Sequence, residues 1–220
     1  MKFDWAANWP QFAEAFGQTI YIVAIAMGVG GLVGLVLGLA LYTTRRGGLL
    51  ENTVVFTVLN VLVNFIRPIP FVIFLTAVGP VTIAITGSRI GTEAFIVPAA
   101  IMASFATSRI VEQNLVALDR GMIEAARSMG ASPLRIIFTV VIPEALAPLI
   151  LGYTFIFVAV VDMSALAGLV GGGGLGDFAL TQGYQRFDWA VTWITVLVIV
   201  ALVQVVQFLG NSLARRVLGR

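Results

Sequence analysis

The chain has 220 residues, of which 59% are hydrophobic and 11% are charged, and its mean hydropathy is +1.00. This composition excludes a water-soluble domain, because too few polar side chains are present to cover a solvated surface. The sequence has no Cys and no His, which excludes disulfides, thiolate or imidazole metal sites and the usual general base, and the net charge of +2 gives no reason to expect nucleic-acid binding.

The first long apolar run covers residues 20–42 and predicts a membrane crossing over 18–43. As a helix this run would be about 35 Å long, enough to cross a bilayer with some tilt. Gly30, Gly34 and Gly38 lie four residues apart, so they would share one helix face and let another helix approach closely.

The second apolar run, residues 53–85, is too long for one straight crossing, so we expect a bend at Pro68 and Pro70 and a crossing over 55–80. Its polar residues are spaced by three or four and would form a stripe on one helix face. The stripe contains Thr53, Thr57, Asn60, Asn64 and Arg67. Hydrogen bonding to other helices and lining of a transport path are equally compatible with it. Asn60, Asn64 and Arg67 are therefore pathway candidates.

Three further apolar runs predict crossings over 94–114, 143–163 and 190–210. Arg109 and Glu112 lie three residues apart and could pair on one helix face. Met163 and Leu166, where the fourth crossing ends, are additional gate candidates. We therefore predict an all-α integral membrane protein with five crossings in a single domain, residues 1–220.

Arginine placement predicts the orientation, because positive residues concentrate on the cytoplasmic side of membrane proteins. With the N-terminus outside, the cytoplasmic side receives eight arginines: Arg45, Arg46, Arg120, Arg127, Arg135, Arg215, Arg216 and Arg220. The outside receives Lys2, Arg89 and Arg186. Arg67 and Arg109 lie within apolar runs and are not counted. This asymmetry predicts a cytoplasmic C-terminus.

The predicted cytoplasmic loop 115–136 interrupts the apolar pattern. The pattern of residues 115–129 predicts a short amphipathic helix. Its apolar side would contain Leu118, Met122, Ile123, Ala126 and Met129. Gly130 would end this helix, and Ser132 followed by Pro133 would begin another. The helix could rest on lipid headgroups or dock a cytoplasmic protein. Because its acids balance its arginines, docking of a protein is at least as well supported as binding to headgroups.

The glycine-rich segment 171–176 lacks the Lys-Ser/Thr pair and the preceding strand of a phosphate-binding loop. We expect a gate-forming or re-entrant turn enclosed by protein there. No carboxylate pair or activated nucleophile is evident, so we do not expect an enzyme.

The loop carries a more specific pattern. Glu124-Ala125-Ala126, then Gly130, then Val140, Ile142 and Pro143 resemble the EAA loop of importer-type ABC transporter permeases. The resemblance implies the membrane domain of a type I importer, in which this loop forms a coupling helix that inserts into a separate ATPase. The residues it assigns to coupling are Leu118, Met122, Glu124, Ala125, Ala126, Gly130, Ser132 and Pro133.

Residues 64–75 and 170–188 also resemble permeases of the methionine uptake transporter family. This resemblance implies a homodimer in a bacterial inner membrane, two cytoplasmic ATPase subunits that hold ATP and Mg, and an external substrate-binding (lipo)protein that delivers methionine. The alternative is a secondary carrier or channel for a small solute, which would work without an ATPase. The few deep acids and the lack of His argue against it.

Overall fold

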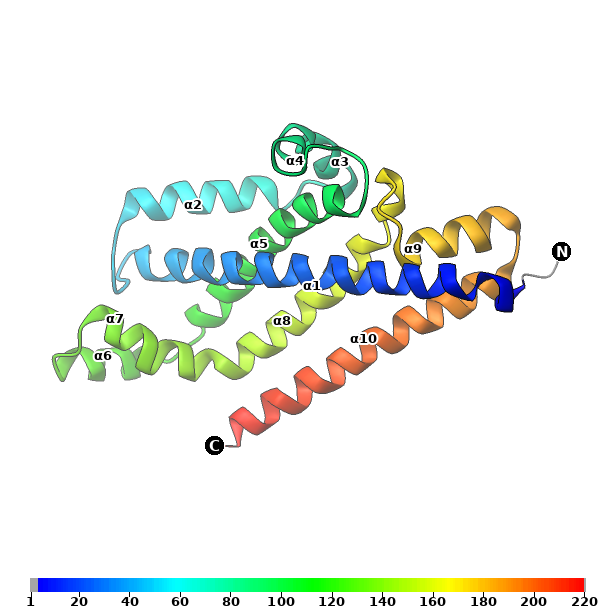
Figure 1. Cartoon of the computed structure of the whole chain (residues 1–220). Coiled ribbons are helices and arrows are strands. Elements are labelled where there is room, and N and C mark those ends of the chain that lie inside the picture. The colour runs from blue at the N-terminus through cyan, green and yellow to red at the C-terminus, as the bar shows by residue number, and fades with distance from the viewer. Residues whose placement is uncertain (1–3, 220) are drawn as a thin grey trace.

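The computed structural model describes residues 4–219, which form helices and no strand (Figure 1). Four continuous helices are long and apolar enough to cross a membrane. They are α1 (Trp5–Thr44), α5 (Thr92–Val116), the joined α7, η1 and α8 (Pro133–Ser164) and α10 (Trp189–Leu218). Together with the bent pair α2 and α3, which is apolar enough to be either a broken span or a re-entrant loop, they confirm the predicted all-α membrane fold.

The second apolar run bends at the prolines, as predicted. α2 (Thr53–Ile66) and α3 (Phe71–Ala77) meet at an angle of 111°. Pro70 precedes α3 directly, and the break follows because proline lacks the N–H that would continue the helix. A further short helix, α4 (Gly79–Thr86), occupies the rest of the apolar run, so no single helix follows the expected crossing over 55–80.

All four continuous helices extend beyond the predicted crossings, and three of them by more than a turn. α1 begins at Trp5, where the Asp4 side chain accepts hydrogen bonds from the N–H groups of Ala6 and Ala7. The fourth crossing begins at Pro133, and α10 continues to Leu218. The hydropathy pattern marks only the apolar part of each helix, whereas caps and backbone hydrogen bonds prolong helices into polar surroundings.

The glycine stripe of α1 brings α5 into close contact, as its spacing predicted. A Cβ placed on Gly34 would lie 2.5 Å from the Thr107 Cβ, and one on Gly38 would lie 2.5 Å from the Val111 Cβ. These distances leave no room for a side chain, so the backbones of α1 and α5 nearly touch.

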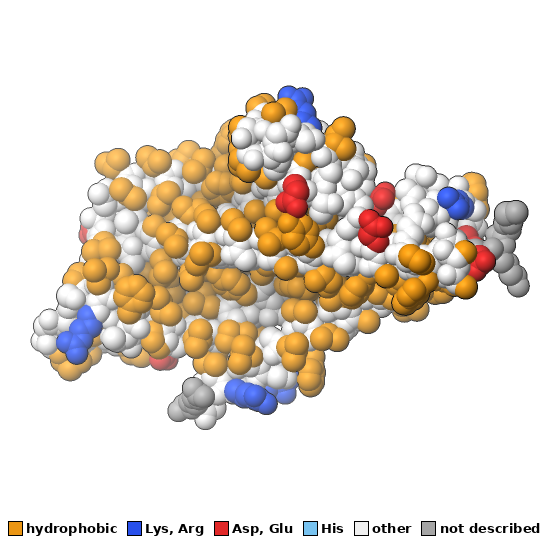
Figure 2. All heavy atoms as spheres, in the orientation of Figure 1, with side chains coloured by type: hydrophobic (Ala, Val, Ile, Leu, Met, Phe, Trp, Pro, Cys, Tyr) orange, Lys and Arg blue, Asp and Glu red, His pale blue; other side chains and the backbone are white. Residues whose placement is uncertain are grey.

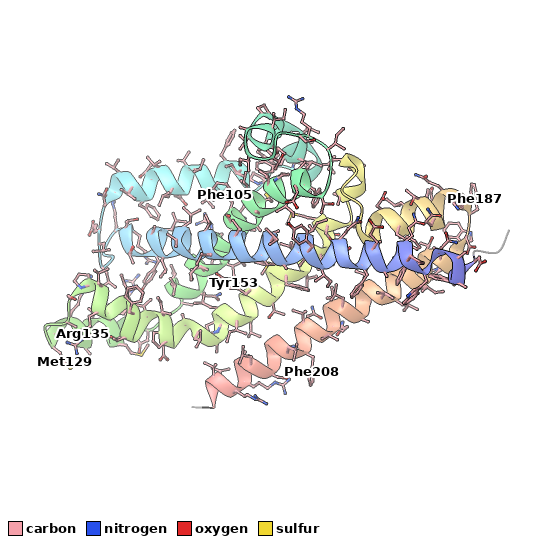
Figure 3. The ribbon with its side chains drawn as sticks, in the orientation of Figure 1. Phe105, Met129, Arg135, Tyr153, Phe187 and Phe208 are labelled. Atoms are coloured by element: carbon pink, nitrogen blue, oxygen red, sulfur yellow. The ribbon has the colours of Figure 1, made fainter. Side chains whose placement is uncertain are left out.

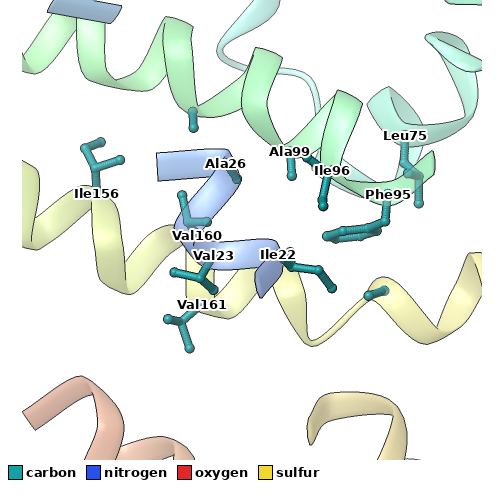
Figure 4. Packing of buried hydrophobic residues seen from close by; sticks show 12 residues of the cluster. Ile22, Val23, Ala26, Leu75, Phe95, Ile96, Ala99, Ile156, Val160 and Val161 are labelled. Carbon is teal, nitrogen blue, oxygen red and sulfur yellow. The ribbon is translucent and has the colours of Figure 1, made fainter. Parts of the chain in front are cut away.

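The main core lies where α1, α5 and α8 meet (Figure 4). Its fully buried side chains include Ile22, Phe95 and Val160. The Tyr153 hydroxyl of α8 also donates a hydrogen bond to the Gly31 carbonyl oxygen of α1, at 2.7 Å. These contacts join the three crossings into one packed unit.

The outer surface is largely apolar. Figure 2 shows hydrophobic side chains along the flank of the molecule, with Lys and Arg gathered in a few places. Large exposed side chains line α1, α2 and α10, among them Leu32, Phe65 and Phe208. Lipid or a second membrane chain is the environment that such surfaces suit.

Candidate coupling elbow and membrane pathway

The loop predicted to face the cytoplasm forms two short helices joined by a sharp corner, and we call residues 118–136 the elbow. α6 (Arg120–Ser128) follows a break after α5, and the Asp119 side chain caps it by accepting a hydrogen bond from the Gly121 N–H at 2.8 Å. The predicted helix over 115–129 is therefore wrong at its start, since Leu115 still belongs to α5. The local reason is that Asp119 offers a helix cap.

The corner of the elbow is a Schellman turn. Gly130 has φ = +79°, its N–H donates to the Arg127 carbonyl, and the Ala131 N–H donates to the Ala126 carbonyl at 3.2 Å. This pair of hydrogen bonds satisfies the last carbonyl groups of α6, and the positive φ favours glycine. The helix-ending role predicted for Gly130 is confirmed.

The second helix of the elbow starts as predicted. The Ser132 hydroxyl accepts a hydrogen bond from the Arg135 N–H at 3.4 Å, and Pro133 occupies the first helical position. α7 (Pro133–Ile136) then passes through a π-helical turn, η1 (Ile137–Val141), into α8 (Ile142–Ser164) without a break. The second helix of the elbow is therefore one end of a long helix that is apolar enough to cross a membrane.

The inner side of the elbow packs on the ends of α5 and α8. Its buried contacts form a second apolar cluster that contains Val111, Leu115, Ala126, Ile136, Val141, Ala145 and Leu149, with Leu118 and Ile123 packed at the edge. The Arg127 guanidinium also donates a hydrogen bond to the Gly48 carbonyl oxygen in the segment between α1 and α2, at 3.0 Å. α6 is thus fixed to three parts of the membrane domain.

The outer side of the elbow is exposed. Glu124, Ala125, Gly130, Ser132 and Pro133 are all accessible, and Met122 is half-buried. Met129 was expected on the apolar side with Ala126 but is 81% exposed, because it lies at the C-cap beyond the last helical turn.

Sequence reasoning missed two neighbouring apolar side chains. Leu134 and Phe138 are also exposed and lie four residues apart on the helix that leaves the corner. Their spacing was a readable signal. Figure 3 shows Met129 at one extremity of the molecule, far from Phe187 at the other. The elbow tip therefore protrudes and exposes apolar side chains among its polar and charged ones.

The polar stripe of α2 meets α5 at a partly exposed hydrogen-bond network. The Arg109 guanidinium donates hydrogen bonds to the side-chain oxygens of Asn60 at 3.3 Å and Asn64 at 2.5 Å, and it pairs with Glu112. The predicted Arg109–Glu112 pair is confirmed, and the stripe is at least partly a hydrogen-bonded seam. Arg67 is exposed, and its side chain makes no hydrogen bond or ion pair with the described residues.

The gate candidates at the other end of α8 are half-buried. Met163 and Leu166 pack against the main core cluster. Their role in a pathway stays a prediction.

The glycine-rich segment packs against α1, and Gly172, Gly174 and Leu175 are buried whereas Gly171 is exposed. The Gly174 N–H donates to the Gln18 side-chain oxygen, and the Leu175 N–H donates to the Thr19 hydroxyl, both at 2.8 Å. These N–H groups start α9 (Gly174–Phe178), so side chains of α1 already occupy the positions that a bound phosphate would take.

The fold and the elbow together define a multi-pass membrane protein with a protruding helical corner at one end. Residues 30–219 match the family described as binding-protein-dependent transport system inner membrane component, and the chain belongs to this family. It is therefore a permease component of a transport system.

The chain is similar along its whole length to proteins of one kind. It is 43% identical over 222 residues to the probable D-methionine transport system permease protein MetI of Vibrio cholerae, covering 99% of each chain. It is 37% identical over 171 residues to the methionine import system permease protein MetP of Bacillus subtilis, covering 78% of this chain and 77% of that protein. A chain in a solved structure of the MetNI methionine ABC transporter, in an inward-facing conformation, shares 34% identity, with a TM-score of 0.93 and 98% and 99% of the two chains covered.

Proposed function

We propose that this chain, as one membrane domain over residues 1–220, forms the translocation pathway of an ATP-driven methionine importer. Two copies pair, two cytoplasmic ABC ATPase subunits dock on the two elbows, and an external substrate-binding (lipo)protein delivers methionine. The names of the similar proteins support the substrate. The observation that carries the mechanism is the unbroken helix from Pro133 to Ser164, which joins the elbow to the far end of a crossing.

Movement passes along this helix. The exposed outer side of the elbow is the surface that a partner grips, with Glu124, Ala125 and Met129 in contact and Gly130 fixing the corner. Because the inner side is packed on α5 and α8, a push on the elbow tilts those crossings as rigid bodies. The tilt displaces Met163 and Leu166 at the other end of α8, where the two copies would open and close the path.

The energy comes from outside this chain. ATP and Mg bind the partner subunits, and this chain acts as a pathway subunit and not as an enzyme. Within residues 4–219 no three His, Cys, Asp or Glu side chains are grouped so that they could hold a metal ion.

The N-terminus lies outside and the C-terminus in the cytoplasm of a bacterial inner membrane. The connection after α1, the elbow and the end of α10 lie toward the end of the molecule away from the N-terminus (Figure 1). These segments carry Arg45, Arg46, Arg120, Arg127, Arg135, Arg215 and Arg216. Their clustering supports this orientation, since cytoplasmic ends of crossings are rich in arginine. Lys2 and Arg220, which also entered the prediction, lie outside the described residues.

Uptake into proteoliposomes tests the proposal. We expect radiolabelled methionine to accumulate only when the chain is reconstituted with its ATPase, its binding protein and ATP. An ATPase variant without hydrolysis activity is the control. Methionine uptake by the chain alone under a proton or sodium gradient would instead establish a secondary carrier.

Pairing of two copies has its own test. Because the sequence lacks Cys, a Met163→Cys variant carries a single thiol. We expect a short bifunctional crosslinker to join two Met163→Cys chains into a dimer in membranes. The yield of crosslinked dimer should be lower for Phe155→Cys, which lies on the exposed face of α8. Equal dimer yields at both positions would contradict a pathway between two copies at Met163.

A further inference from the structure

A cavity of about 290 Å³ lies between the segment that connects α1 to α2 and the helix α6. Its wall contains four arginines: Arg45, Arg46, Arg120 and Arg127. Glu124 is the one acidic side chain on the wall. The cavity is therefore strongly positive, although it is formed by a chain with a net charge of only +2.

Among the described residues, none of these four arginines forms an ion pair. The ion pair between Arg109 and Glu112 is the one salt bridge among the described residues, and it lies elsewhere. Arg127 donates to the Gly48 carbonyl, and the Arg45 guanidinium lies 5.9 Å from the centre of the Tyr42 ring. Neither contact supplies a negative charge. Arg46 and Arg120 make no side-chain hydrogen bond with the described residues.

Glu51, the acid on the segment between α1 and α2, is already engaged. Glu51 accepts a hydrogen bond from the Gly47 N–H at 3.1 Å and does not line the cavity. The tight turn that brings Arg45 and Arg46 to the cavity depends on this bond and on the positive φ of Gly47. The connection is thus built to present guanidinium groups and not to neutralise them.

The position and the rest of the lining indicate the ligand. Arg45 directly follows the last helical residue of the membrane-crossing α1, so the cavity lies where a crossing meets the headgroup region. Leu49, Val116 and Ile123 add an apolar wall beside the arginines. A phosphate joined to an apolar body fits both parts, and guanidinium groups bind phosphate oxygens with paired hydrogen bonds.

We propose that this cavity binds the headgroup phosphate of an anionic phospholipid. The arginines hold the phosphate, and the apolar wall contacts the glycerol and the first part of an acyl chain. A bound lipid then bridges the α1–α2 connection and α6, so that it adds to the contact made by Arg127 with Gly48 and stiffens the elbow.

Lipid binding to the purified full-length chain tests the proposal. The chain is delipidated in a mild detergent and titrated with phosphatidylglycerol, phosphatidylcholine or inorganic phosphate, with native mass spectrometry as the readout. The test variant is Arg46→Gln/Arg120→Gln, because these side chains make no internal hydrogen bond that folding would miss. The matched control is Arg215→Gln/Arg216→Gln, which removes the same charge from the exposed last turn of α10.

We expect the chain to bind phosphatidylglycerol in preference to phosphatidylcholine, and inorganic phosphate not to displace it. Each arginine removed from the cavity should weaken binding about fivefold, so the double variant should lose about 25-fold, whereas the α10 variant should bind like the natural chain. Equal loss in both variants, or no loss in the cavity variant, would overturn the proposal. Displacement of the lipid by inorganic phosphate would also overturn it, since the site would then recognise a free anion.

Discussion

The Arg109 guanidinium on α5 donates a hydrogen bond to the Asn64 side-chain oxygen on α2, at 2.5 Å. This contact holds the first half of the bent span against the α5 helix. Both residues lie within apolar stretches, where a polar group without a partner is costly.

We expect Asn64→Leu to destabilise the protein by about 1 kcal/mol, because Arg109 loses its closest amide acceptor. A double-mutant cycle with Arg109→Gln, measured by unfolding in detergent and SDS mixtures, should give a coupling energy of similar size. Thr53→Leu, at an exposed position on the same helix, is the control. Strictly additive effects of the Arg109 and Asn64 variants would show that the hydrogen bond contributes nothing.

The contact between α1 and α5 predicts opposite effects for two glycines of one helix. In Gly34→Ala the new Cβ would lie 2.5 Å from the Thr107 Cβ, so the helices must separate, and we expect a loss of about 1–3 kcal/mol. Gly28→Ala meets nothing within 4 Å and should be neutral or stabilise the helix by up to about 1 kcal/mol. Thermal unfolding of the two variants compares them directly, and similar melting temperatures would contradict the tight packing at Gly34.

The corner of the elbow predicts a strong preference at position 130. Gly130→Val places a β-branched residue at φ = +79° and should cost about 1–2 kcal/mol locally, which distorts the corner. We expect less ATPase to co-purify with the permease and ATP-driven methionine uptake to fall, while membrane insertion stays normal.

Gly130→Asn is the matched variant, because Asn tolerates a positive φ. It should retain more ATPase and more uptake than the valine variant. Wild-type uptake by Gly130→Val would remove the corner from the coupling mechanism.

The start of α9 depends on Thr19. Thr19→Val keeps the size of the side chain but leaves the buried Leu175 N–H without its acceptor, at a cost of about 1–3 kcal/mol. Hydrogen exchange of residues 171–178 should accelerate in this variant. Exchange unchanged from the natural chain would mean that the glycine-rich segment keeps its structure without the Thr19 hydrogen bond.

Thiol labelling tests the orientation. In intact cells we expect a membrane-impermeant maleimide to label Gln185→Cys, which is exposed between α9 and α10. Ser128→Cys on the elbow should react only after the membrane is opened. Labelling of Ser128→Cys in intact cells would place the elbow outside and refute the coupling mechanism with it.

Much of the fold could be predicted from the sequence, because a helix that crosses a lipid bilayer needs about 20 consecutive, mostly apolar residues. The bend at Pro68 and Pro70 and the helix stop at Gly130 were predictable because proline and glycine act through local backbone geometry.

Other features required the three-dimensional structure. The partners of Asn60 and Asn64 are far away in the sequence, and only packing of α2 on α5 reveals Arg109 as the donor. The helix start at Ser132 and Pro133 was predictable, but its continuity with the fourth crossing was not, because the charged Arg135 lies between this start and the apolar run. The exposure of Met129 depends on which turn is the last of α6, and helix ends are poorly specified by periodicity.

The π-helical turn over Ile137–Val141 has a consequence for the direction of force. A π turn accommodates one more residue than an α turn, so it offsets the faces of the helix on its two sides by roughly 100°. The azimuth at which the elbow protrudes from the crossing is therefore set by a single inserted residue. Shortening this turn by one residue would swing the elbow around the helix axis without altering one side chain of the elbow itself.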